Sequence, residues 1–428
     1  MKSPDEKGRT KQSSRTSSGR ASYVDESERD LPLKAQMRRL FWTMGCTTSL
    51  DVKLRAYITG EQRATGPQEF TDLDVLSIGF SPSGKPHLTL ADCKTARARA
   101  VERMFWLRGV SEFFVADEAF MVRSNAVPAA ARTLSTRLGV GVVDPDDLRS
   151  LAKTYHSPVD LEGPLRCLFD VDSIRRHMEN MSGLDRKLDS LVDFVRFDYW
   201  VYEPFRNLTQ VIAHLAEAAP ALNPGHPRHL GVFFQTAWQY AFALARATYS
   251  IRTSRMAEIP IAVESYVAGG ELALREKAQL GILLHKAGIS VDPRSGILPP
   301  YVEQLTELVT RVINKPAETG EILRYAEFLA TAVVVGESAT VAAAFGSANV
   351  RPVAAKLLAD VCGFLVTAAG LRPEFRAAAR ARLVADLTGG AETGALSMVG
   401  IAGRAPSPLV PSEQANPAQL ILPPSDRE

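Results

Sequence analysis

The spacing of hydrophobic residues changes once along the 428-residue chain, near Leu151. Up to that point helical and strand patterns alternate, and beyond it strand patterns almost disappear. Leu33–Met44 places its apolar residues on one helical face, whereas Ser49–Ile58 alternates apolar and polar residues as a strand does. The order of elements that follows, αβββαβαβ, predicts an α/β domain over residues 31–151 with a mostly covered sheet.

Two strands and a tight turn are the clearest feature of this domain. Glu69–Phe80 and His87–Lys94 are rich in strand-forming residues, and Ser81–Pro86 between them has the composition of a turn. We therefore expect a β-hairpin. Further along, the pattern predicts these elements: a helix at Ala96–Arg108, a strand at Glu112–Ala116 that Ala119–Arg123 extends or follows, a helix at Ala126–Leu138 and a strand at Val140–Val143.

Residues 152–400 are predicted to form a large all-α region of one or two domains. Prolines fall between the helical stretches, where helices should stop. The expected helices are Ser173–Trp200, Phe205–Ala218, His229–Arg255, Glu271–Ala287, Val302–Ile313, Glu321–Phe345, Val353–Leu371 and Glu374–Leu387. The two ends look different: residues 1–30 predict a disordered arm rich in Ser, Lys and Arg, and residues 401–428 a disordered Pro-rich tail.

Composition narrows the classes of protein that this chain can be. Lys and Arg number 50 against 48 Asp and Glu, so the net charge is only +2, and any binding of nucleic acid must use a local patch. Four cysteines stand apart without metal-ligand spacing, as free thiols of a reducing compartment do. With no apolar leader and no long uncharged apolar stretch, we expect a cytoplasmic protein that does not enter membranes.

The candidate catalytic and metal-binding residues lie on the predicted hairpin. Period 2 places Asp72 and Asp74 on one face of the first strand, and Asp92 and Lys94 on one face of the second. A register that sets Asp74 beside Asp92 adds the main-chain carbonyl of Cys93 to two carboxylates. Such an oxygen-rich site suits Mg²⁺ or Mn²⁺, and Lys94 would orient a water and stabilise negative charge. The alternative is a solvated strand face whose ion pairs contribute little.

These residues resemble the PD-(D/E)xK nuclease superfamily, which has the restriction-endonuclease-like fold. The resemblance rests on Asp74 at a strand and on Leu90-Ala-Asp92-Cys-Lys94 after a hairpin, and it covers about residues 32–150. It implies an αβββαβ core in which Asp74 and Asp92 ligate metal and Lys94 assists the hydrolytic water. Many members of that family carry a Glu on the first core helix. Leu33–Met44 offers only Gln36 there, with Glu28 and Asp30 upstream.

Basic residues follow the candidate site directly. Arg97, Arg99 and Arg103 lie in the next predicted helix and suit contacts with nucleic-acid phosphates, although a solvated helix face is the alternative. Phe105 and Trp106 of the same segment are expected in the core.

The sequence thus predicts a Mg²⁺-dependent nuclease, an endonuclease rather than an exonuclease. DNA is preferred to RNA by analogy with the family alone. The helical region would serve a protein partner or a homo-oligomer. The alternative is a non-catalytic nucleic-acid-binding or helical interaction protein with a degenerate nuclease fold.

Overall fold

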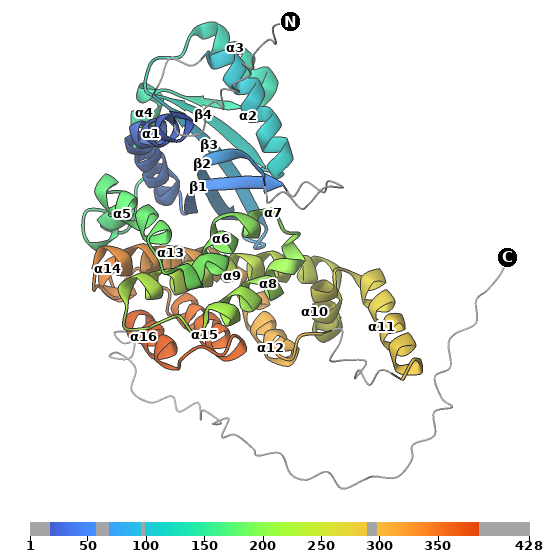
Figure 1. Cartoon of the computed structure of the whole chain (residues 1–428). Helices are drawn as coiled ribbons and strands as arrows, with labels where there is room; N and C mark the ends of the chain where they lie inside the picture. Colours follow the sequence, from blue (N-terminus) through green and yellow to red (C-terminus); the bar gives the residue numbers. More distant parts are fainter. Residues whose placement is uncertain (1–17, 57–67, 96–98, 289–297, 385–428) are drawn as a thin grey trace, which may run out of the picture. The chain divides into compact units, whose positions relative to one another are not determined.

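The computed structural model of the chain describes residues 18–56, 68–95, 99–288 and 298–384, and shows an α/β part followed by a helical part (Figure 1). Over these residues the sheet has five strands in the order β1-β2-β3-β4-β5. The first three strands pair antiparallel, whereas β4 pairs parallel to β3 and β5 parallel to β4. The strands are β1 (Thr47–Ala56), β2 (Gln68–Phe80), β3 (Pro86–Lys94), β4 (Glu118–Arg123) and β5 (Gly141–Val143).

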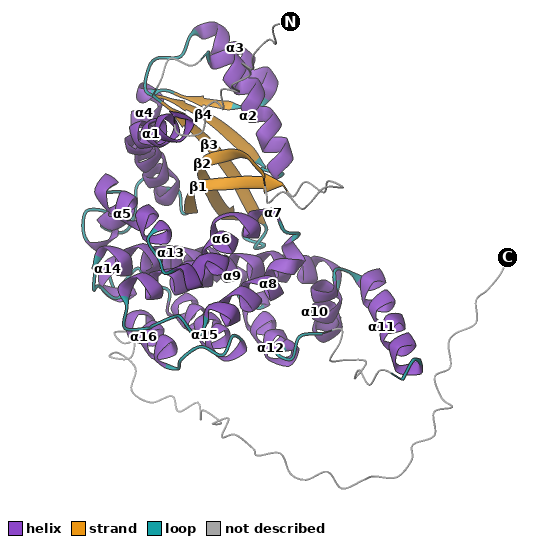
Figure 2. Ribbon diagram, viewed as in Figure 1, coloured by secondary structure: helices purple, strands orange, loops and turns teal. Residues whose placement is uncertain are grey.

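Helices cover both faces of this sheet, with α1 (Ser18–Thr43) on one side and α2 (Ala100–Phe114) on the other (Figure 2). Leu33, Met37 and Phe41 of α1 pack with Val75 and Cys93 of the sheet. On the other side, Met104 and Leu107 of α2 belong to the main hydrophobic cluster. Two shorter helices, α3 (Ala129–Leu138) and α4 (Pro145–Thr154), flank β5.

The first helix is longer than the sequence pattern indicated. It begins at Ser18 rather than Leu33, so residues 18–30 of the predicted disordered arm are helical, and the rest of the arm lies outside the described residues. Asp30 and Lys34 are buried, with 4% and 1% of their surface exposed. Because Asp30 faces protein although it is charged, it interrupts the apolar pattern from which the helix start was predicted.

The hairpin prediction is confirmed. β2 and β3 pair from Val75–Ala91 to Phe80–Pro86, and Gly84 takes the left-handed conformation of the turn at φ +72°. The strand predicted at Glu112–Ala116 is wrong, because α2 continues to Phe114 and β4 begins only at Glu118. That short apolar segment fits a buried helix end as well as a strand, and periodicity does not separate the two.

From residue 152 to residue 384 the described residues form helices and their connections, as predicted. The α-helices are α5 (Val171–Ser182), α6 (Asp189–Asp193), α7 (Tyr199–Val201), α8 (Pro204–Ala218), α9 (Pro227–Ser254), α10 (Ile259–Ala268), α11 (Glu271–Lys286), α12 (Val302–Ile313), α13 (Thr319–Val335), α14 (Val341–Phe345), α15 (Pro352–Ala368) and α16 (Glu374–Leu383). The predicted helix Ser173–Trp200 is broken after Ser182, and its later part includes a π-helical turn at Phe194–Asp198. The predicted helix Glu321–Phe345 ends at Gly336, where φ is +83°. The predicted tail, residues 401–428, lies outside the described residues.

A buried carboxylate joins the α/β part to the helices. Glu327 of α13 accepts hydrogen bonds from Arg38, from the indole of Trp42, and from the hydroxyls of Thr47 and Thr48. One hydrophobic cluster also runs from Trp42 and the sheet into α9 and α13. The described part of the chain therefore packs as one compact unit. Within it, we find no helix with the length and apolarity needed to span a membrane.

Candidate metal centre

Asp74, on β2, is the central carboxylate of the candidate site and is only 3% exposed. Its Oδ1 lies 2.9 Å from the ammonium of Lys34 on α1, and its Oδ2 lies 3.3 Å from that of Lys94 on β3. The same Oδ2 accepts a 2.8 Å hydrogen bond from the backbone N–H of Cys93. Burial alone would raise the pKa of Asp74, but the two ammonium groups and this hydrogen bond hold it below its usual value.

Carboxylates lie on three adjacent strands at this level of the sheet. Asp51 of β1 falls between the Leu50–Val75 and Val52–Leu73 pairs, which sets it opposite Asp74. The β2–β3 pairing ends at Val75–Ala91, and one further step in the same register sets Asp74 beside Asp92. Neighbouring like charges repel one another. Cations between and around these carboxylates are therefore needed to stabilise the row.

Lys94 supplies one of these cations. Its Nζ lies 3.3 Å from Asp74, 3.5 Å from Asp30 and 4.0 Å from Asp92. Burial lowers the pKa of Lys94, but Asp74 and Asp92 outweigh it and raise the pKa overall, so the side chain stays charged. The ammonium thus marks a position where at least three carboxylates share one cation.

Arg103 of α2 holds Asp92 through both oxygens. Its Nε lies 2.7 Å from Oδ2 and its second nitrogen 2.5 Å from Oδ1, the two-pronged geometry typical of strong arginine–carboxylate pairs. The guanidinium also lies over the ring of Trp106, 3.4 Å from its centroid. Burial raises the pKa of Asp92 in spite of this pairing, and the charge of Asp74 adds to that effect.

Two residues of the first helix complete the site. Lys34 contacts both Asp51, at 2.5 Å, and Asp74, at 2.9 Å. Asp30 accepts hydrogen bonds from the backbone N–H and the hydroxyl of Thr95, at 2.8 and 2.5 Å, and pairs with Lys94. The sequence interpretation did not include them in the site. The spacing of four between Asp30 and Lys34, which places both on one helix face, was the available signal.

A second grouping of carboxylates adjoins the first. Asp51, Asp72 and Asp74 each place an oxygen within 4.8 Å of the others, close enough to hold one metal ion. Asp51 Oδ2 is buried and has no hydrogen-bond partner, so this oxygen is available for a ligand. The backbone of Asp51 has φ +49°, an uncommon value for a non-glycine residue.

The remaining predicted residues are placed as follows. Cys93 is fully buried, and since N–H and C=O of a strand residue point to one side, its carbonyl faces the same edge as the bond to Asp74. Arg99 precedes α2, is 83% exposed and pairs with Glu102. Arg97 lies outside the described residues. Phe105, predicted to be in the core, is exposed.

Among the described residues, Asp51, Asp72 and Asp74 are the carboxylates that lie close enough together to hold a small divalent cation. Asp30, Asp51, Asp74 and Asp92 are four carboxylates that form ion pairs with three cations, Lys34, Lys94 and Arg103. These carboxylates thus outnumber the cations that pair with them by one. Carboxylate oxygens are the preferred ligands of Mg²⁺ and Mn²⁺.

Comparisons of the chain with protein-family models, with curated proteins and with solved structures found no match.

Proposed function

We propose that this protein is a metal-dependent phosphodiester hydrolase, a nuclease whose α/β part has a restriction-endonuclease-like core. The observation that carries the proposal is the shared position of the Lys94 ammonium between Asp74 and Asp92. Two strand carboxylates and a lysine two residues after the second form the Asp-x-Lys arrangement of the PD-(D/E)xK superfamily. Asp30 supports the proposal further, because it supplies an acid from the first helix.

The chain's own side chains divide the work of such a site. Asp74, Asp92 and the Cys93 carbonyl would hold Mg²⁺ or Mn²⁺, with Asp72 and Asp51 close by. When bound, the ion lowers the pKa of a coordinated water and neutralises charge on a phosphoryl oxygen. Lys94 stays protonated, orients the attacking water and stabilises the negative charge that develops during hydrolysis.

The arginines have two different roles in this proposal. Arg103 fixes the orientation of Asp92 through its paired bonds, and is therefore a positioning residue. Arg99 is exposed beside the site and suits a phosphate of the substrate backbone. DNA as the substrate and cleavage within the strand are proposed from the family resemblance. The helical part would bind a protein partner or a second copy of the chain.

A cleavage assay tests the proposal. The full chain is incubated with linear, circular and single-stranded DNA in Mg²⁺, in Mn²⁺ and in a chelator. We expect cutting, including of the circular form, only when metal is present, and expect Asp92→Asn and Lys94→Ala to abolish it. Lys187→Ala is the matched control, because Lys187 is the lysine of another Asp-x-Lys sequence, Asp185-Arg-Lys187, and is exposed at a helical turn. Absence of cutting in both metals would overturn the proposal.

One observation favours a second function, binding of nucleic acid without cleavage. Both oxygens of Asp92 are engaged by Arg103, so metal binding requires Asp92 to share them. If that pairing persists, the α/β part would bind phosphates through Arg99 and leave them intact. Affinity for DNA that is unchanged by metal, together with no cutting, would support this second function.

A further inference from the structure

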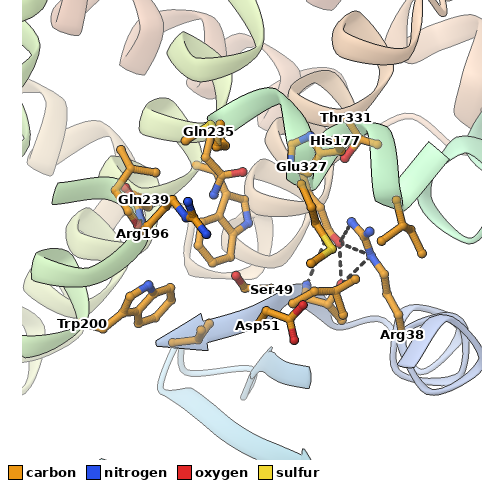
Figure 3. Close-up of a pocket in the computed structure, with 18 residues that line it drawn as sticks. Arg38, Ser49, Asp51, His177, Arg196, Trp200, Gln235, Gln239, Glu327 and Thr331 are labelled. Carbon is orange, nitrogen blue, oxygen red and sulfur yellow. Dashed lines mark hydrogen bonds and ion pairs between the residues drawn. The ribbon is translucent and has the colours of Figure 1, made fainter. Parts of the chain in front are cut away.

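A cavity that shares Asp51 with the candidate metal centre lies between β1 and the helices α5 and α9 (Figure 3). It has a volume of about 120 Å³, or about four times the roughly 30 Å³ that one water occupies in the liquid. Asp51 lines it from the sheet, His177 from α5, Gln239 from α9, and Trp200 and Trp238 from its helical side. Small-molecule sites have this mixture of aromatic walls and a few convergent polar groups.

Three residues that line this cavity each have a buried polar atom without a hydrogen-bond partner among the described residues: Asp51 Oδ2, His177 Nδ1 and Gln239 Oε1. Leaving such an atom without a hydrogen bond costs about 1–3 kcal/mol. Three such atoms in the residues around one cavity therefore indicate that a ligand forms hydrogen bonds with them. Gln239 is 1% exposed, and its Nε2 donates a 2.6 Å bond to the Val195 carbonyl. That bond leaves the amide oxygen as the free end.

The unsatisfied atoms are mainly acceptors. The Gln239 amide oxygen can only accept a hydrogen bond. Asp51 Oδ2 is an acceptor in the carboxylate form, and burial raises the pKa of this residue. Burial lowers the pKa of His177 to about 4, so its ring is neutral at pH 7 and one ring nitrogen accepts. A ligand that satisfies the Gln239 oxygen must therefore present an N–H or O–H donor, and a ligand with a second donor also satisfies the Asp51 carboxylate.

The charged groups and aromatic rings that line the cavity limit the chemical class of the ligand further. Arg38 is neutralised by Glu327 at 2.9 Å, so it offers no strong field for an anion in the cavity. The indole of Trp238 is fixed by a 2.8 Å bond from its Nε1 to Thr47, and its ring centroid lies 6.2 Å from that of Trp200. Two indoles beside a cavity of this size suit a flat ring.

We propose that this cavity binds a nucleobase that carries an exocyclic amino group. Such a base is planar and presents N–H donors to Asp51 and Gln239. The base can belong to a free nucleoside or nucleotide, or to a nucleotide turned out of a nucleic-acid strand. The inference goes beyond the proposed nuclease function, since binding here requires neither metal nor hydrolysis.

Calorimetric titration of the full chain, in a chelator that removes metal, tests this directly. The probes are guanosine, adenosine, cytidine and uridine, followed by a short single-stranded oligonucleotide. We expect at least one amino-bearing nucleoside to bind tenfold more tightly than uridine. Binding of the oligonucleotide alone would identify a base of a nucleic acid as the source. Absence of binding by every probe, or equal binding of uridine, would overturn the proposal and leave ordered water as the occupant.

Substitutions of two lining residues test whether the nucleoside binds in this cavity. Gln239→Met and His177→Phe should each weaken binding at least tenfold. His214→Phe is the matched control, because His214 stacks on Phe194 at 4.5 Å and does not line the cavity. Circular dichroism establishes that each variant is folded. Unchanged affinity in both folded cavity variants would contradict the proposal. Since metal is absent throughout, failure here is distinct from failure of the nuclease proposal.

Discussion

The ammonium of Lys34 on α1 lies 2.9 Å from Asp74 Oδ1 on β2, and both side chains are almost fully buried. The same ammonium contacts Asp51, so one lysine balances two carboxylates beneath the first helix. Burial lowers the pKa of Lys34, but Asp51 and Asp74 outweigh that effect and raise it overall. The first helix therefore neutralises charge in the candidate site as well as covering the sheet.

Replacing Lys34 should destabilise the fold. Lys34→Met would leave Asp51 and Asp74 buried without this partner, and breaking a buried pair in this way costs about 3–5 kcal/mol. Urea unfolding measures the free energy of unfolding. Lys187→Met, at an exposed position, serves as the control and should change it by less than about 0.5 kcal/mol. A loss below about 1 kcal/mol in Lys34→Met would contradict the role assigned to this ion pair.

The junction between the α/β part and the helices should depend on Glu327. Glu327→Leu removes the acceptor of Arg38, Trp42 and Thr47, and leaves the arginine buried without its counter-charge. We expect a loss of about 3–5 kcal/mol in unfolding free energy. Glu321→Leu is the matched control on the same helix, where the carboxylate pairs with Arg324. Equal effects of the two substitutions would argue against a special role for Glu327.

Stability should fall with acid because of His177. Its pKa is about 4 in the folded protein against 6.5 ordinarily, owing to burial and to the charge of Arg38. Above pH 6.5 the imidazole is neutral in the folded and the unfolded protein, so the free energy of unfolding keeps its full value. As the pH falls from 6.5 to 4 the unfolded protein takes up the proton first, and the free energy of unfolding decreases by up to about 3 kcal/mol. Urea unfolding at pH 7, 5.5 and 4 measures it. His177→Phe should remove this share of the pH dependence, and an unchanged slope would refute the assignment.

Arg103 and Arg99 should affect different kinetic constants. Arg103→Lys loses the paired geometry that orients Asp92, so kcat for DNA cleavage should fall about 10–100-fold with KM little changed. Arg99→Ala removes a phosphate contact, so KM should rise and the salt dependence of binding weaken by about one unit of slope. Steady-state kinetics at two salt concentrations separate these effects. If Arg103→Lys raised KM alone, Arg103 would be a substrate contact instead.

Local signals predicted the hairpin well, and with it the neighbourhood of Asp74, Asp92 and Lys94. The turn chemistry of Ser81–Pro86 and the alternation on either side are properties of adjacent residues, which a sequence displays directly. A register read from the hairpin was enough to bring the three side chains together.

Buried polar residues were harder to predict. Asp30 and Lys34 break the apolar pattern because each forms an ion pair with a charged residue on a strand. These partners are distant in sequence, so hydrophobic periodicity does not reveal them. Asp51 alternates with the apolar Leu50 and Val52 of its strand, and this pattern does not indicate that it lies beside Lys34 and a cavity. Its contacts depend on how α1 and α5 pack against the sheet, which is a long-range property.

The rate of DNA cleavage in Mg²⁺ by the unaltered chain, by Lys94→Ala and by Lys187→Ala tests the central claim most directly. We expect the unaltered chain and Lys187→Ala to cut at the same rate, and Lys94→Ala to be slower by roughly 100-fold or more, as for the loss of one charge-stabilising group. All three must show the same thermal unfolding. Equal rates for Lys94→Ala and the unaltered chain, or no cutting by any of them, would contradict a hydrolytic site at Asp74, Asp92 and Lys94.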